Sequence, residues 1–505
     1  DAITTGDNNT ALGYNTMTAN TTASSNTAVG GEAMLTNTTG ASNVAVGYAA
    51  LYTNNGAENV AIGKDAMRLN TTAGQNVAIG FEAMEANTTG VRNLAIGYQA
   101  YTASDTENDN IAIGYQAMTT NTAGGVQNIA LGNYALDALT SGDDNVAIGL
   151  NSLGATTTGS ANIGIGGNTG AANTTGTRNI AIGYEAYDNS DTENDNMAIG
   201  YRAMTVNTAG GTQNIAIGNY AADALTSGDN STIIGYNAGT SITTGGSHVA
   251  IGRHALKTVT TVTDCVAVGM HALEANTVSA TTAIGSYSLY KNTTGTGNTG
   301  VGYTTLEENT TGSNNTAVGS NTLDANTTGA SNVAVGTDAL GANTTADLST
   351  AVGYKALEDN VGTSNTALGA NSGLQNTTGA YNLSLGTDSL RDNTTGDFNT
   401  AIGRAALQSN TTADSNIAIG RNAMYLNTTG TRNLAIGALA YDASDTENDN
   451  IAIGHGAMTT NTAGGTKNTA LGVYAMDALT SGDDNVGLGY AALGALNTGS
   501  ANVAV

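Results

Sequence analysis

The stretch Asn37–Leu51, which reads NTTGASNVAVGYAAL, contains the pattern that decides the fold of this chain. Its core, Asn43-Val44-Ala45-Val46-Gly47, returns along the chain as N-x-A-x-G, and the closing glycine of each copy marks the register. There are 29 complete copies, and of the 28 intervals between their glycines 22 are 17 residues long, three are 16 and three are 18. A period near 17 is too short for helical-pair repeats and predicts one coil of a β-solenoid per repeat.

Within a coil the pattern predicts two short strands. The first is Asn43–Gly47, which is rich in β-branched residues and ends at a glycine suited to a tight turn. The second is Ala49–Tyr52, and the N-T-T-G segment Asn37–Gly40 is the connecting loop. Residues are gained or lost at this loop, as in Asn121–Gly125, so we expect an exposed corner. The fold class is therefore all-β, a β-solenoid or parallel β-roll of about thirty coils, running as one continuous array over residues 1–505.

The first strand suggests how chains associate. Val44 and Val46 point to one side and Ala45 to the other, and this middle position is Ala in 24 of 29 copies. A solvent-facing position would collect polar residues, so we expect both faces to be covered, the alanine face by another chain. The predicted chain–chain interface comprises Ala45, Ala61, Ala78, Ala95 and Ala112. In the alternative, the alanines pack inside a single wider coil and the solenoid is monomeric.

The asparagine that opens each copy predicts a structural ladder. It is present in 25 of 30 copies, and stacked coils bring such side chains about 4.8 Å apart, within reach of amide hydrogen bonds. The predicted ladder includes Asn43, Asn59, Asn76, Asn93 and Asn110. Cys265, the only cysteine, takes one of these positions, which predicts a buried neutral thiol and excludes an intramolecular disulfide.

Composition limits the functional classes. Charged residues make up 11% of the chain and the formal net charge is −26, which suits a solvated extracellular surface and disfavours nucleic acid and anionic membranes as partners. No run of about 18 apolar residues predicts a membrane span. The chain begins and ends inside a repeat, so we expect it to be a segment of a longer fibre protein whose anchor lies elsewhere. Three near-identical blocks, Arg92–Gly149, Arg178–Gly235 and Arg432–Gly489, suggest growth by duplication.

Few residues suggest chemistry, and we expect no enzymatic activity and no cofactor. The S-D-T-E-N-D-N loops offer hard oxygens that calcium prefers, although their spacing matches no known calcium loop. The candidate ligands are Asp105, Glu107, Asp109, Asp191, Glu193, Asp195, Asp445, Glu447 and Asp449. The alternative is a solvated acidic loop. His254 and His271, which are 17 residues apart, are either a metal pair or two exposed rings.

Two further ladders have alternative interpretations. Tyrosines after the coil glycine, such as Tyr48 and Tyr98, either hold glycans or stack to stiffen the rod. The thirteen N-T-T-[GA] segments are formal glycosylation sequons, but we interpret them first as turns. Their paired threonines also allow an ice-binding surface as an alternative.

The motif N-x-A-[IV]-G-x-x-A, as in Asn76–Gly80 and Asn110–Gly114, resembles the head repeats of trimeric autotransporter adhesins. The coils of that family are shorter, and the full form from Asn315 to Gly329 resembles repeat regions of bacterial and phage tail-fibre-domain proteins. The resemblance implies a left-handed roll, three chains about one axis and a place on a cell or virion surface. We therefore expect a homotrimeric, adhesin-like bacterial surface fibre that can join end to end; a phage tail fibre and a calcium-, glycan- or ice-binding solenoid are the alternatives.

Overall fold

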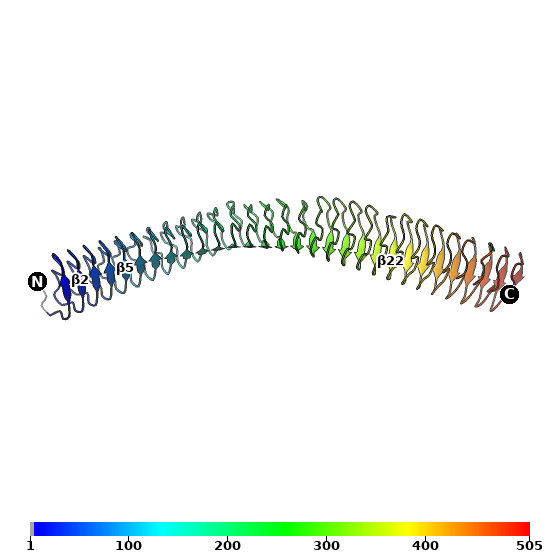
Figure 1. The fold of residues 1–505 in the computed structure, drawn as a ribbon, viewed down its shortest axis with the longest axis horizontal. Helices are drawn as coiled ribbons and strands as arrows, with labels where there is room; N and C mark the ends of the chain where they lie inside the picture. Colours follow the sequence, from blue (N-terminus) through cyan, green and yellow to red (C-terminus); the bar gives the residue numbers. More distant parts are fainter. Residues whose placement is uncertain (1–4) are drawn as a thin grey trace. The chain divides into compact units, whose positions relative to one another are not determined.

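The structure, a computed structural model, describes residues 5–505, and the chain divides into two compact units, Asp1–Thr261 and Val262–Val505. Each unit is a parallel β-solenoid whose successive coils each contribute one strand arrow in Figure 1. Every helix or strand within residues 5–505 is a strand. The predicted all-β solenoid with coils of about 17 residues is confirmed. The first four residues of the predicted array lie outside the described part.

One short strand opens each coil, and nearly all strands are three residues long. The strands of the first unit are β1 (Thr10–Leu12), β2 (Thr27–Val29), β3 (Val44–Val46), β4 (Val60–Ile62), β5 (Val77–Ile79), β6 (Leu94–Ile96), β7 (Ile111–Ile113), β8 (Ile129–Leu131), β9 (Val146–Ile148), β10 (Ile163–Ile165), β11 (Ile180–Ile182), β12 (Met197–Ile199), β13 (Ile215–Ile217), β14 (Thr232–Ile234) and β15 (Val249–Ile251). Those of the second are β16 (Val266–Val268), β17 (Thr282–Ile284), β18 (Thr299–Val301), β19 (Thr316–Val318), β20 (Val333–Val335), β21 (Thr350–Val352), β22 (Thr366–Leu368), β23 (Leu383–Leu385), β24 (Thr400–Ile402), β25 (Ile417–Ile419), β26 (Leu434–Ile436), β27 (Ile451–Ile453), β28 (Thr469–Leu471), β29 (Val486–Leu488) and β30 (Val503–Ala504).

Within each unit, successive strands pair in parallel and in register, so like residues stack on like. Ala45 of β3 is the partner of Ala61 of β4, which in turn is the partner of Ala78 of β5. The coil glycine, which follows the strand, must be glycine for two reasons. Gly47 has φ 138°, and a Cβ there would lie 2.4 Å from the carbonyl oxygen of Gly63. The column of coil glycines therefore stacks backbone directly against backbone.

The second predicted strand, Ala49–Tyr52, is wrong. This segment and the residues beside it form a turn arm, residues 48–53 in this coil, in which Ala49 and Leu51 have positive φ of 53° and 51°. The arm still bonds to neighbouring coils: the N–H of Ala49 donates to Gly31 O and that of Leu51 to Ala66 O, both at 3.0 Å. Because these bonds satisfy the backbone without an extended conformation, each unit has one sheet rather than two.

The core lies between the sheet and the turn arms of the same chain. Ala45 is 0% exposed, and it belongs to the same buried cluster as Ala50, Leu51 and Met34 of the arms. The coil is thin, so the inward strand position has room only for a small side chain. In the second unit the equivalent cluster contains Ala401, Ala406 and Leu407.

The prediction that the alanines form a chain–chain interface is therefore wrong. Ala45, Ala61, Ala78, Ala95 and Ala112 are all fully buried within a single chain. Their neighbour across the narrow gap is the chain's own turn arm, which is why the position stays small. The outward residues of the strand are the valines and isoleucines, and Val46 is 36% exposed.

Candidate functional site

The predicted asparagines form a hydrogen-bonded column inside each unit, here called the first Asn ladder. The backbone N–H of Asn76 donates to Oδ1 of Asn59 at 3.0 Å, and that of Asn93 donates to Oδ1 of Asn76 at 2.8 Å. The amide Nδ2 of Asn76 donates to the carbonyl oxygen of Gly90 at 2.8 Å. The bonds thus run from side chain to backbone, whereas the sequence suggested amide-to-amide contacts. Asn43, Asn59 and Asn110 have the same backbone-to-amide bond.

The asparagines of the N-T-T-G loops form a second Asn ladder that the sequence did not predict. Nδ2 of Asn309 donates to Oδ1 of Asn292 at 2.7 Å, and Nδ2 of Asn326 donates to Oδ1 of Asn309 at 2.8 Å. Each also donates to the glycine at the end of its own loop, as Asn326 does to Gly329 at 3.0 Å. The predicted exposed corner is therefore exposed only in part: Thr39 faces solvent, whereas Asn37 and Gly40 are buried.

Burial of this second ladder bears on the sequons. Their asparagines are at most 1% exposed: Asn20, Asn37, Asn70, Asn87, Asn173, Asn292, Asn309, Asn326, Asn343, Asn376, Asn393, Asn410 and Asn427. A side chain that donates two buried hydrogen bonds has no room for a glycan. In the folded chain these segments therefore act as turns, as interpreted from the sequence.

The acidic loops do not bring their carboxylates together. Glu107 is 2% exposed, and its Oε2 accepts hydrogen bonds from Ser104 Oγ at 3.0 Å and from the N–H groups of Asp105 and Thr106 at 2.9 Å. Its Oε1 accepts from the N–H of Gly124 in the next coil at 3.1 Å. Glu193 and Glu447 are likewise buried. Four donors thus satisfy the buried carboxylate within the protein.

The aspartates of the same loop have other partners. Asp109 forms a two-pronged ion pair with Arg92 at 2.6 and 2.7 Å, and the pair lowers the pKa of Asp109. Asp105 accepts from the hydroxyl of Thr88. Asp195 and Asp449 pair with Arg178 and Arg432 in the same way. Asp191 and Asp445 instead accept loop hydrogen bonds through their carbonyl oxygens. The candidate calcium ligands therefore form separate structural contacts, not a converging ligand set.

A buried tyrosine in each 58-residue block was missed by the sequence analysis. The hydroxyl of Tyr101, which is 0% exposed, accepts from Nδ2 of Asn110 at 2.6 Å and from Nδ2 of Asn121 at 3.2 Å. Burial raises the pKa of Tyr101 well above the usual range, and the same holds for Tyr187 and Tyr441. The available signal was position, because Tyr101 aligns with Leu and Met residues of the other turn arms.

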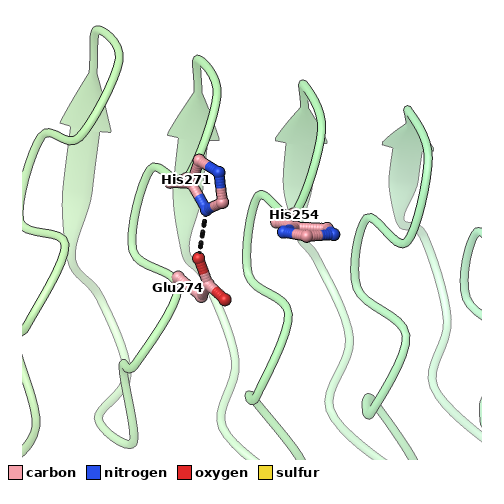
Figure 2. Close-up of side chains that lie close together, drawn as sticks. All are labelled: His254, His271 and Glu274. Carbon is pink, nitrogen blue, oxygen red and sulfur yellow. Dashed lines mark hydrogen bonds and ion pairs between the residues drawn. The ribbon is translucent and has the colours of Figure 1, made fainter.

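The histidines have no predicted catalytic neighbours. Figure 2 shows His271 with its Nδ1 hydrogen-bonded to Glu274, both in the second unit, while His254 belongs to the first. Within the second unit this arrangement supplies two potential metal ligands. Cys265 is 0% exposed, its Sγ contacts the carbonyl oxygen of Val278 at 3.4 Å, and burial raises its pKa. The thiol is therefore buried and neutral, as predicted.

The exposed aromatic side chains stack along the coils. Phe81, Tyr98 and Tyr115 follow the coil glycine, a place here called the ring position, and their centroids are 5.1 and 5.3 Å apart with rings 10° and 9° from parallel. Stacked rings cover one another's faces, leaving mainly edges to solvent. Within such a stack, stiffening of the rod is thus a better interpretation than glycan binding.

The largest uncommitted surface is the outer strand face, defined as the first and third residues of the strands. These residues are Val, Ile, Leu, Met or Thr, and none is charged. In the first unit Ile62 is 38% exposed and Leu131 is 42% exposed. Apolar patches of this kind mark interaction surfaces. The alternation V-A-V held this signal, but the sequence analysis assigned the two sides of the strand the wrong way round.

Comparison with known proteins identifies no relative: no family model matches the chain, and no curated protein is similar to it. The fold itself is typical of structural repeat proteins. Within residues 5–505, no helix combines the length and apolar character needed to cross a membrane.

Proposed function

We propose that the chain is a structural element of an extracellular fibre, in which copies of the chain pack against one another through the outer strand face. The observation that carries this proposal is a continuous, charge-free aliphatic surface on an otherwise strongly acidic chain. A solenoid of nearly identical coils adds length without adding new sites, which suits a spacer or stalk better than a catalyst. An adhesin-like stalk on a bacterial surface fits the resemblance of the repeats.

Charge favours a second copy through this face and disfavours contact elsewhere. With a formal net charge of −26, two chains repel one another through their loops and turn arms. The outer strand face has no charge to desolvate, so apolar burial is opposed least there. Its side chains also repeat at the coil spacing of about 4.8 Å, which another copy with the same spacing matches along its whole length.

The area is sufficient for a stable contact. The fifteen strands of the first unit span about 70 Å at about 4.8 Å each, and two outward side chains cover a width of about 10 Å. The face therefore offers about 700 Å² per copy, close to the roughly 800 Å² that each partner contributes to a standard interface. Three chains about one axis is the stoichiometry that the resemblance to autotransporter heads implies.

The assembly is tested by light scattering on the full chain. We expect about three chains per particle for the unmodified protein and single chains for a variant with Ile79→Lys and Ile96→Lys, which places two charges on the face. Thr72→Lys with Thr89→Lys, in exposed loop positions next to the same coils, is the matched control. Single chains in the unmodified protein, or an unchanged mass in the face variant, contradict the proposed packing.

The extracellular location needs a separate measurement. Antibodies raised against the chain and applied to intact producing cells and particles should label surface fibres in immunogold electron microscopy. Labelling only after the cells are opened would refute a surface role, whatever the oligomeric state.

A further inference from the structure

One place on the first unit combines an open pocket with an uncovered aromatic face. The pocket, about 440 Å³, crosses four successive coils and is lined by Glu32, Tyr48, Tyr52, Asp65, Arg68 and Glu85. Its volume lies in the range of small-ligand sites. It opens over the turn arms, away from the outer strand face, so it is independent of the proposed fibre contact.

The ring of Tyr48 is uncovered because the preceding coil has glycine in the ring position. A Cβ on Gly31 would lie 3.5 Å from Cδ2 of Tyr48, so any larger side chain there would cover the ring. In the stack above, Phe81 takes that place for Tyr98 at a centroid distance of 5.1 Å. Tyr48 is 51% exposed, and its hydroxyl donates to Oε2 of Glu32 at 2.9 Å, which fixes the ring beside the pocket.

The polar groups around the ring are nearly balanced in charge. Arg68 pairs with Glu85 at 2.8 Å and Lys64 pairs with Asp65 at 2.6 Å, so two of the three carboxylates have a cation beside them. Paired carboxylates keep free lone pairs that accept hydrogen bonds from hydroxyl groups, and a guanidinium has donors to spare. The third carboxylate, Glu32, already accepts from Tyr48, and it disfavours an anionic ligand.

We propose that this pocket binds a neutral sugar, whose apolar pyranose face lies on the Tyr48 ring while its hydroxyls bond to Arg68 and the carboxylates. An aromatic platform with a few fixed polar groups is the chemistry that a ring with one apolar face and polar edges requires. This inference goes beyond the fibre role and does not depend on it.

The chain provides a matched control. Gly167 precedes Tyr184 in the same way, since a Cβ on Gly167 would lie 3.4 Å from Cδ2 of Tyr184. The neighbouring coil position held by Tyr52 near Tyr48 is Asp188 near Tyr184, so that second uncovered ring lacks the aromatic pair. Neither glycine has the positive φ that would exclude a side chain. Gly31→Tyr should therefore close the pocket by stacking, and Gly167→Tyr should make an equal change away from it.

The test is saturation-transfer NMR on the full chain with neutral tetrasaccharides of glucose, galactose and N-acetylglucosamine, a sialylated oligosaccharide and choline as probes. We expect transfer to the pyranose C–H protons of at least one neutral probe, a loss of affinity of about tenfold or more with Gly31→Tyr, and no change with Gly167→Tyr. Tyr48→Leu, which removes the platform without filling the ring position, should give the same loss.

Several outcomes would overturn the proposal: no binding of any neutral probe, undiminished binding in Gly31→Tyr and Tyr48→Leu, or a preference for the sialylated probe or choline. Light scattering on the same variants reports assembly separately. A failed sugar site therefore leaves the fibre proposal standing, and a monomeric chain that binds sugar leaves this one standing.

Discussion

Replacing Asn76 by alanine tests whether the first Asn ladder holds the coils together. The amide of Asn76 is 0% exposed, accepts from the N–H of Asn93 at 2.8 Å and donates to the carbonyl oxygen of Gly90 at 2.8 Å. Asn76→Ala leaves both backbone groups buried without a partner, at a cost of about 1–3 kcal/mol each. We expect a total destabilisation of about 2–5 kcal/mol, since the two losses are in different coils.

The chain itself provides the milder substitution. Ser231 occupies the same position in another coil, where its hydroxyl accepts from the N–H of His248 at 3.2 Å. Asn76→Ser keeps the acceptor and loses only the bond to Gly90, so it should cost about half as much as alanine.

The assay is hydrogen exchange at single-amide resolution, combined with urea unfolding. In a solenoid the damage is local, because stability is set by each coil and its neighbours. Exchange of the Asn93 amide should accelerate strongly, while amides several coils away change little. An alanine variant whose Asn93 amide exchanges at the unmodified rate, with urea stability within about 0.5 kcal/mol of the parent, would refute the ladder as a stabilising element.

Three further predictions concern packing and ionisation. Gly30→Ala should destabilise by about 3 kcal/mol or more, because its Cβ would lie 2.3 Å from the carbonyl oxygen of Gly47; its neighbour Gly31→Ala should stay within about 0.5 kcal/mol of the parent in urea titrations, and equal effects would contradict the glycine column. Because the pKa of Tyr101, Tyr187 and Tyr441 is raised in the folded chain, their contribution to stability is complete below the unfolded pKa of about 10 and is lost as pH rises above it. Thermal melting of the triple Tyr→Phe variant should therefore depend less on pH above about 10 than that of the parent, and parallel curves would count against buried, neutral phenols. Cys265 should be unreactive to a thiol reagent in the native chain and should react fully in urea; rapid native labelling would show that the thiol is accessible.

The repeat period was enough to predict the architecture, because a 17-residue coil with one β-branched run and fixed turn residues has few other solutions. The orientation of the strand was harder. In V-A-V both sides are apolar, and small size at Ala45 is compatible with a neighbouring chain or with the chain's own arm. Only the distance to the turn arm decides between them, and that distance depends on how the arm folds.

The turn arm itself was mispredicted for a local reason. Ala49-Ala50-Leu51 has the composition of a short strand, yet Ala49 and Leu51 adopt left-handed conformations. Such conformations cost energy in non-glycine residues, and they persist because the coils on both sides fix the hydrogen bonds. Nothing in a single coil shows this, since the stabilising partners lie one repeat away.

The candidate sites divide in the same way. The first Asn ladder could be found from position alone. The burial of Glu107 could not be found from its acidic surroundings, although aligning S-D-T-E with N-T-T-G places Glu107 at the buried loop glycine. The uncovered face of Tyr48 depends on a glycine 17 residues earlier, a relation that becomes meaningful only once the coils are stacked.

The bond from Gly124 to Glu107 also limits how such a protein can lengthen. A copying event that ended between these two coils would leave a buried carboxylate oxygen without its donor, whereas one that included both would be tolerated at once. The three blocks each contain the whole pair: Glu107 with Gly124, Glu193 with Gly210 and Glu447 with Gly464. Where coils are joined by such a bond, the smallest heritable module is longer than the geometric repeat, and recombination breakpoints should avoid the interval between them.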